Sequence, residues 1–177
     1  MEGLPAGRIL QPWSPGWKDK FIHESIILRK ILGDEILEIH HIGGTSNPHI
    51  PYSKPILDIL VVVDNITRID DYAGRFRKFG YYARGENGII GRRYFVKGVT
   101  QRTHHVHIFE EGDDHIDDML TLNQYLLHHP DRAAAFGAVK RELADRYSHH
   151  VRLYEREKGP HILRLLQEAK DWAGKRE

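Results

Sequence analysis

The feature that most constrains the fold is the segment 55–63, in which every residue after Pro55 is apolar except Asp58. Successive side chains of a strand point to opposite sides of a sheet, so apolar residues at both odd and even positions predict a strand buried on both faces. Such a strand lies in the middle of a sheet that other layers cover. The segment therefore predicts an α/β (α+β) fold built around this strand.

The rest of the chain predicts an open mixed sheet with flanking helices. Helix caps, glycines and prolines divide it into helical and extended segments. In the first part of the chain we expect a helix from Pro15 to Gly33 with Ser14 able to cap it, a strand at 36–42, and a Gly-, Asn-, Pro- and Ser-rich loop at 43–53. After the strand at 55–63 we expect a helix capped by Thr67 and ended by Gly80, and then two or three strands within 81–109. Helices follow from about 116 onward, one starting at Pro130 and another near Pro160. One domain is expected over 1–177, with a sheet core at about 1–112 and a helical part at about 113–177.

Composition limits the class of protein. The 177 residues are 40% hydrophobic and 29% charged, as in an ordinary globular chain, and the absence of Cys excludes disulfides and Cys-based zinc sites. No apolar run approaches the roughly 18 residues that span a bilayer, and the first residues lack a secretory signal, so a cytoplasmic protein without a membrane partner is expected. Basic and acidic residues are mixed at a net charge of +1, so nucleic acid is not an expected partner; the oligomeric state is left open.

Asp58 is the sharpest anomaly of the central strand. An isolated carboxylate among apolar residues carries a heavy desolvation penalty, and a buried Asp is rarely without a partner. We therefore predict that Asp58 faces a metal, a cation or a polar pocket, with a catalytic role. The alternative is a structural Asp that pairs with an Arg or caps a loop.

The loop before this strand is a candidate binding site for phosphate or a nucleotide. Gly43 and Gly44 would let backbone amides approach a ligand, and Thr45 and Ser46 add hydroxyl groups. Lys54, just before the strand, would bind a phosphate or pair with Asp58. The alternatives are an ordinary turn and a solvent-exposed Lys.

Histidines are frequent, with 13 in the chain, and one group has the spacing of a ligand set. His105 and His107 share one face of a predicted strand, and His104 takes the other. With Asp58 on a neighbouring strand they would form a two-His, one-carboxylate metal site. They could equally donate hydrogen bonds to a phosphate or lie on a polar sheet face.

Arginines offer further candidates for holding an anion through bidentate contacts: Arg92, Arg93 and Arg102. Exposed strand charges are the alternative for each. Lys140 and Glu142, on a predicted helix, are expected to be solvated surface charges.

Residues 41–61 read HIGGTSNPHIPYSKPILDILV and resemble the signature of the GrpB family, roughly HIGSTxxPGLxxKPIIDIxV. Four further segments look like other parts of that family, in the same order: 12–17, 91–95, 102–107 and 125–144. The resemblance thus covers nearly the whole chain.

The resemblance implies a fold similar to that of nucleotidyltransferases, in which a Gly-Ser loop holds nucleotide phosphates and two carboxylates on the next strand bind Mg²⁺. Gly43 and Gly44 would be the loop, and Asp58 the first carboxylate. The implied function is a metal-dependent nucleotidyltransferase, or a protein that binds a nucleotide or another phosphorylated small molecule, with the acceptor left open. The implied cofactor is a divalent metal, Mg²⁺ or Mn²⁺, or another transition metal at a His-rich site.

Several departures from that pattern favour a second hypothesis. Gly44 replaces the loop Ser, His49 stands where the family has Gly, and Leu60 occupies the position of the second carboxylate. Asp64 is on the same strand face as Asp58 but about 20 Å along the strand, against about 4 Å between the metals of a two-metal site. The alternative is a catalytically inactive ligand- or partner-binding module on the same fold.

Overall fold

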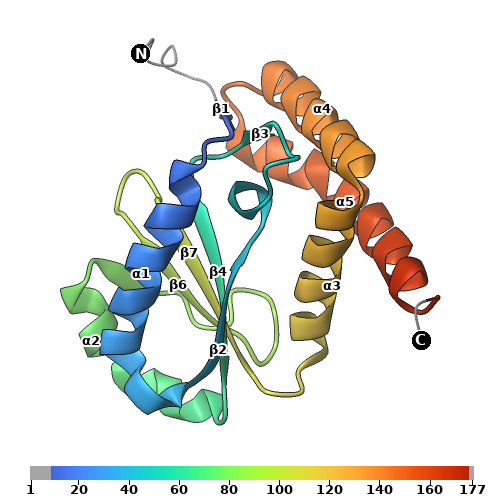
Figure 1. The fold of residues 1–177 in the computed structure, drawn as a ribbon. Helices are drawn as coiled ribbons and strands as arrows, with labels where there is room; N and C mark the ends of the chain where they lie inside the picture. Colours follow the sequence, from blue (N-terminus) through green and yellow to red (C-terminus); the bar gives the residue numbers. More distant parts are fainter. Residues whose placement is uncertain (1–8, 176–177) are drawn as a thin grey trace.

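The computed structural model describes residues 9–175 and contains a five-stranded mixed sheet (Figure 1). β4 is parallel to β7, and the other neighbouring strands are antiparallel. In spatial order the strands are β2 (Ile36–Ile42), β4 (Leu57–Val63), β7 (His104–Glu110), β6 (Arg93–Lys97) and β5 (Tyr81–Ala83). The predicted fold class and the strand at 36–42 are confirmed, and the apolar run forms β4 inside the sheet.

The two faces of the sheet are covered by helices from different parts of the chain. α1 (Gly16–Leu32) and α2 (Ala73–Lys78) cover one face, where the odd-numbered residues of β4 are buried against them. α3 (Asp114–His128) packs against the other face, where Leu60 and Val62 contact its Ile116. Asp58 belongs by its even number to this second face, the side on which the C-terminal helices lie (Figure 1).

The C-terminal helices form a layer beside α3. α4 (Pro130–Arg146) begins at Pro130, as predicted, because a proline at the first helical position has no backbone N–H to leave unsatisfied. α5 (Val151–Ala173) follows and packs against both α3 and α4. No helix within residues 9–175 is both long and apolar enough to cross a membrane.

The predicted helix start near Pro160 is wrong, because Pro160 lies inside α5. Tyr154, Leu165 and Ala169 are buried on this helix on both sides of the proline. Their packing against the neighbouring helices keeps the helix continuous although Pro160 donates no hydrogen bond.

The predicted cap at Thr67 is also wrong. The cap is Asn65, whose side chain accepts a hydrogen bond from the backbone N–H of Thr67 at 3.0 Å. The turns that follow form a 3₁₀ helix, Ile66–Tyr72, before α2 begins. Asn is among the strongest capping residues, so the signal was present two residues earlier.

A second, two-stranded sheet ties the beginning of the described chain to the loop before β4. β1 (Gln11–Pro12) pairs antiparallel with β3 (Tyr52–Ser53). Next to it, the backbone N–H of Trp13 donates to the carbonyl of Pro51 at 2.9 Å, and the indole N–H donates to the carbonyl of Thr45 at 3.0 Å. These bonds tie the 43–53 loop to the segment that leads into α1.

Candidate functional site

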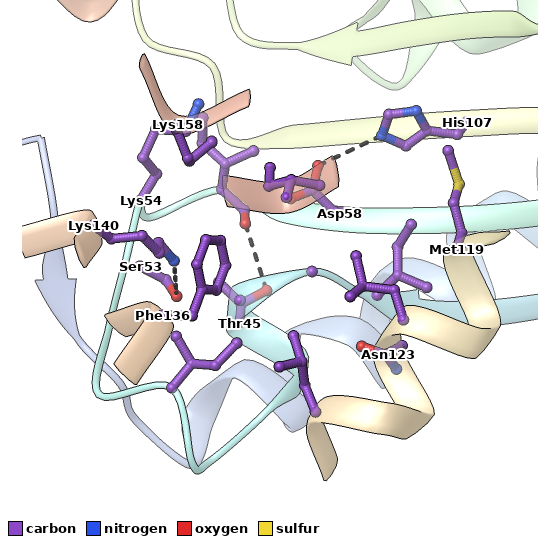
Figure 2. Close-up of a pocket in the computed structure, with 18 of the residues that line it drawn as sticks. Thr45, Ser53, Lys54, Asp58, His107, Met119, Asn123, Phe136, Lys140 and Lys158 are labelled. Atoms are coloured by element: carbon purple, nitrogen blue, oxygen red, sulfur yellow. Dashed lines mark hydrogen bonds and ion pairs between the residues drawn. The ribbon is translucent and has the colours of Figure 1, made fainter. Parts of the chain in front are cut away.

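A cavity of about 270 Å³ lies where the 43–53 loop and the start of β4 meet α3, α4 and α5 (Figure 2). Its polar lining comes from Gly43, Gly44, Thr45 and Ser53 of the loop, Asp58, His107, Asn123, Tyr154 and three lysines. Its apolar lining is larger and consists of Ile42, Ile50, Ile56, Met119, Leu122, Leu126, Phe136 and Ile162. A mainly apolar hollow with a few converging polar groups is typical of a small-molecule site.

Asp58 faces this cavity from the second residue of β4, and 31% of its side chain is accessible. The parallel register places it opposite His105 of β7. His105 Nδ1 is 3.2 Å and His107 Nε2 is 3.6 Å from the same carboxylate oxygen, Oδ1. Burial by itself would raise the pKa of Asp58, but the two imidazoles hold it well below its usual value. The carboxylate is therefore permanently charged near neutral pH.

Arg92 determines which nitrogen of His107 carries the proton. Its guanidinium is buried, and it donates to the carbonyls of Glu86 and Asn87 at 3.1 and 2.8 Å. Its Nη1 also lies 3.4 Å from His107 Nδ1. Because Arg is a donor at every nitrogen, Nδ1 accepts and the proton lies on Nε2, facing Asp58.

The predicted two-His, one-carboxylate set does not fit a metal ion as these residues are placed. His105 and His107 share a face, with His104 on the other, as predicted, but the nitrogens nearest Asp58 are directed at its Oδ1. Within residues 9–175, no group of three or more His, Asp or Glu is placed to hold a metal ion. Leu60, at the position of the second carboxylate, is fully buried.

The prediction that Lys140 is exposed to solvent is wrong, because only 5% of the residue is accessible. α4 lies so close to the loop that a Cβ on Gly137 would come within 2.4 Å of Pro51 Cδ, and this approach encloses the lysine. Its ammonium donates to the hydroxyl of Ser53 at 3.1 Å, and no carboxylate in the described chain forms an ion pair with it. Burial, with the charges of Lys158 and Lys54 added, lowers the pKa of Lys140 to about 7.

Two further lysines at the same end of the cavity share one carboxylate. Lys158 Nζ lies 2.8 Å from Glu155 Oε2, and Lys54 forms an ion pair with Oε1 of the same residue. Burial by itself would raise the pKa of Glu155, but the two ammonium groups hold it below its usual value. With Lys140, three lysines thus face one glutamate, and this end of the cavity attracts anions.

Tyr154 of α5 adds a polar group that lacks a partner. The residue is fully buried and lines the cavity, yet its hydroxyl makes no hydrogen bond within the described chain. Burial raises the pKa of this hydroxyl, so it is protonated at neutral pH. A buried hydroxyl without a partner is unfavourable unless a ligand or water completes it.

The two glycines of the loop stand where side chains would not fit. Gly43 has φ +74, and a Cβ there would lie 2.9 Å from Asp58 Oδ2. A Cβ on Gly44 would lie 2.2 Å from Ser53 Oγ and 2.8 Å from Lys140 Nζ. The loop backbone thus runs close to both the carboxylate and the buried lysine.

The hydroxyl groups predicted to bind phosphate are engaged in holding the loop. Thr45 Oγ1 lies 2.9 Å from His41 Nε2, and Ser46 Oγ lies 2.6 Å from the carbonyl of Gly43. Ser46 Oγ also lies 2.9 Å from Asn123 Oδ1 of α3. Thr45 lines the cavity, whereas these contacts give Ser46 a bracing role between the loop and α3.

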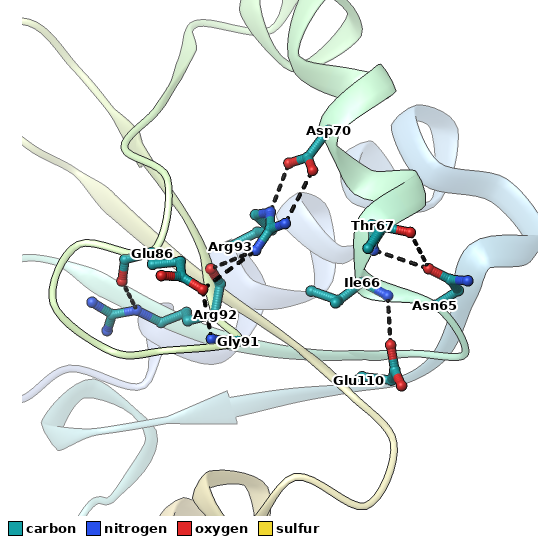
Figure 3. Close-up of polar contacts among 9 residues, drawn as sticks. All are labelled: Asn65, Ile66, Thr67, Asp70, Glu86, Gly91, Arg92, Arg93 and Glu110. Atoms are coloured by element: carbon teal, nitrogen blue, oxygen red, sulfur yellow. Dashed lines mark hydrogen bonds and ion pairs between the residues drawn. The ribbon is translucent and has the colours of Figure 1, made fainter.

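None of the three arginines predicted to bind an anion lines the cavity, and Arg92 lies behind it, beside His107. Arg93 points to the opposite face of the sheet, where its Nε and Nη2 contact the Asp70 carboxylate at 2.6 and 3.0 Å (Figure 3). Arg102 is exposed before β7 and interacts with the Tyr94 hydroxyl. The structure therefore brings together Gly43, Gly44, Thr45, Lys54, Asp58 and His107 in one cavity, with His105 behind Asp58.

Sequence reasoning missed the residues that the C-terminal helices supply. Lys140, Tyr154 and Lys158 come from α4 and α5. Tyr154 and Lys158 are four residues apart and so share a helix face, which was the one signal available. Nothing in the local sequence of Lys140 distinguishes it from a surface lysine.

The GrpB family model, described as GrpB protein, matches residues 9–168. The UPF0157 protein YqkA of Bacillus subtilis is 38% identical over 156 residues, which are 88% of this chain and 45% of YqkA. This chain therefore spans less than half the length of that relative.

Solved structures agree with the family match. The crystal structure of the conserved protein GrpB from Enterococcus faecalis has a TM-score of 0.87 at 35% identity, covering 93% of this chain and 99% of the other. Cid1, an RNA terminal uridylyl transferase, has a TM-score of 0.52 at 13% identity, covering 76% of this chain and 42% of Cid1. The likeness to Cid1 is one of fold, and it confirms the predicted nucleotidyltransferase-like architecture.

Proposed function

The chain belongs to the GrpB family, and on that premise we propose that its cavity binds a phosphorylated small molecule of the nucleotide class. The observation that carries the proposal is the buried ammonium of Lys140 in the cavity wall. It has one hydrogen-bond partner, the Ser53 hydroxyl, and it lies over the ring of Phe136. A buried charge is unfavourable without a compensating charge close by. In the described chain no carboxylate lies within ion-pair distance of Lys140, and Asp58 and Glu155 act on it only from farther away. A phosphate group at this position would compensate it.

The surroundings of Lys140 suit the same ligand. Lys54 and Lys158 are its neighbours in the cavity wall, and the hydroxyl of Tyr154 is free to donate. The backbone of Gly43 and Gly44 borders the same space without side chains. The apolar wall from α3 and α4 would hold a flat or hydrocarbon part of the ligand, such as a base.

The test is a calorimetric titration with ATP, UTP and inorganic pyrophosphate in the presence of EDTA. We expect the wild type to bind at least one of them, and Lys140→Met to bind about tenfold or more weakly, because a charge-assisted hydrogen bond is lost. Lys30→Met, an equal charge change at an exposed position of α1, is the matched control and should bind as wild type does. Equal binding by Lys140→Met and wild type would sink the proposal.

Nucleotidyl transfer is a second candidate, favoured by the likeness of the fold to Cid1, an RNA terminal uridylyl transferase. Asp58 would be the carboxylate for it, with His105 and His107 as the predicted metal partners. The imidazoles would have to turn away from Asp58 Oδ1 before a metal could bind, and Leu60 supplies no second carboxylate. Binding without turnover, the alternative on the same fold, is therefore our first choice.

The two candidates separate in one assay. Pyrophosphate release would be followed with UTP or ATP and Mg²⁺ or Mn²⁺, for wild type beside Asp58→Asn. Release by the wild type that Asp58→Asn abolishes would establish catalysis and a metal-dependent Asp58. No release by either protein, with nucleotide binding intact, would establish the binding module.

A further inference from the structure

We infer that the ligand carries, besides its anionic group, a hydroxyl group that donates a hydrogen bond to Asp58 Oδ2. This inference rests on the proposed function and names the class of ligand more closely. Its basis is the arrangement of the two carboxylate oxygens of Asp58 and of the cationic groups across the loop from them.

The two oxygens of Asp58 have different surroundings. Both neighbouring imidazoles approach Oδ1, His105 at 3.2 Å and His107 at 3.6 Å. Oδ2 instead faces the loop, 2.9 Å from the position that a Cβ on Gly43 would take. Nearly a third of the side chain is accessible, and the residue lines the cavity, so Oδ2 is the oxygen open to a ligand.

An ionised carboxylate can only accept hydrogen bonds. It would repel a phosphate oxygen, so the part of the ligand that meets Asp58 must be a donor. An ammonium group would also donate, but the three lysines of this cavity outnumber its two carboxylates, Asp58 and Glu155, and disfavour a cationic ligand. A hydroxyl group satisfies the carboxylate without adding positive charge.

The spacing between the two recognition points is short. Asp58 Oδ2 lies beside Gly43 and Lys140 Nζ lies beside Gly44, and these glycines are consecutive residues. Consecutive Cα atoms are about 3.8 Å apart, so both recognition points border the same short stretch of loop and lie within reach of one small ligand. A sugar phosphate, the ribose phosphate of a nucleotide, or a smaller polyol phosphate has this arrangement.

The experiment uses two probes of the same charge and carbon number, sn-glycerol 3-phosphate and n-propyl phosphate, each titrated into the ¹⁵N-labelled full chain and followed by NMR. We expect glycerol phosphate to bind roughly tenfold to a hundredfold more tightly, the usual range for a hydrogen bond to a charged group. Asp58→Asn should remove most of this preference. It should make propyl phosphate bind more tightly, because the repulsion of a carboxylate is removed.

Each remaining outcome decides the inference. Equal binding of the two phosphates by the wild type, with both weakened by Lys140→Met, would overturn the hydroxyl and leave the anion site standing. Tighter binding of 3-aminopropyl phosphate than of glycerol phosphate would assign an ammonium group instead. No binding of any probe, pyrophosphate and the nucleotides included, would overturn the proposed function and this inference together. The comparison in the wild type needs no variant, so a folding defect of Asp58→Asn does not affect it.

Discussion

Buried charged side chains lie on both faces of the sheet, but their partners differ. Under α1, the carboxylate of Glu24 is 3% exposed and has three partners: the Tyr81 hydroxyl at 2.7 Å, Lys97 Nζ at 2.8 Å and His104 Nε2 at 3.3 Å. On the cavity side, Lys140 is similarly buried, but its contacts are neutral: the Ser53 hydroxyl and the ring of Phe136. Neighbouring residues of β7 even serve the two sides, because His104 points to Glu24 and His105 to Asp58.

We interpret this difference as one between a carboxylate that stabilises the fold and an ammonium group that is available for ligand binding. A buried carboxylate surrounded by donors is satisfied by the chain itself. Under the proposed function, a ligand in the cavity would supply the missing partners of the Lys140 ammonium and of the Tyr154 hydroxyl. Substitutions on the two sides should therefore change stability and binding in opposite proportions.

The largest effect on stability is expected from Glu24→Ala. Removing this carboxylate leaves the fully buried Tyr81 hydroxyl without its acceptor and Lys97 without its partner, so the free energy of unfolding should fall by about 3 kcal/mol. Urea denaturation measures it, with the exposed Glu142→Ala as the control that changes little. Phosphate binding should remain as in the wild type. Weakened binding in a folded Glu24→Ala protein would contradict the separation of the two sides.

Lys140→Met should weaken phosphate binding and stabilise the ligand-free protein. The Lys140 pKa of about 7 lies below that of an unfolded lysine, so the unfolded chain binds more protons above pH 7 and stability rises with pH in that window. In the ligand-free protein at pH 7, Met at this position should raise the free energy of unfolding by about 2 kcal/mol, because a desolvated amine is removed. Wild-type stability should rise by about 2 kcal/mol between pH 7 and pH 9, and that of Lys140→Met should not. Parallel pH profiles for the two proteins would show that Lys140 is solvated.

Acid should destabilise the protein through its buried histidines. Burial lowers the pKa of His41 and His104 to about 4, whereas an unfolded histidine titrates near 6.5. The unfolded chain therefore binds more protons between these values, and stability is lost as pH falls from about 6.5 to 4. His104→Gln should reduce that loss by about 2 kcal/mol, measured by urea denaturation at both pH values. An unchanged pH dependence in His104→Gln would assign the loss to other groups.

The smallest stability effect belongs to Tyr154→Phe. Its hydroxyl has no partner in the described chain, so removing it should change the free energy of unfolding by less than about 1 kcal/mol or even raise it. Pyrophosphate or nucleotide binding should weaken about fivefold to tenfold, because a donor to the ligand is lost. Calorimetry on the same samples gives both numbers when it is paired with thermal unfolding. A large loss of stability with unchanged binding would place Tyr154 among the structural residues.

Most of the fold could be predicted from local sequence patterns. The apolar run at 55–63 required a strand covered on both faces, and Pro130 marked a helix start, because both signals act through local backbone and burial preferences. The sequence also singled out Asp58 and the glycine loop, since a lone carboxylate in a buried strand is costly wherever the rest of the chain lies. The predicted helix start near Pro160 was wrong, because the packing of the buried residues of α5 outweighs one missing backbone hydrogen bond.

Which charged side chains contact one another depends on long-range packing and could not be predicted from the sequence. Lys140 is some 80 residues from Asp58 in sequence and is enclosed because α4 packs closely over Pro51, a contact that no local pattern encodes. Arg93 and Tyr94 are neighbours in β6, yet the alternation of the strand sends the arginine to Asp70 and the tyrosine toward His105 and His107. The type of a residue and its strand or helix follow from the sequence, whereas its desolvation and its partners follow from long-range packing.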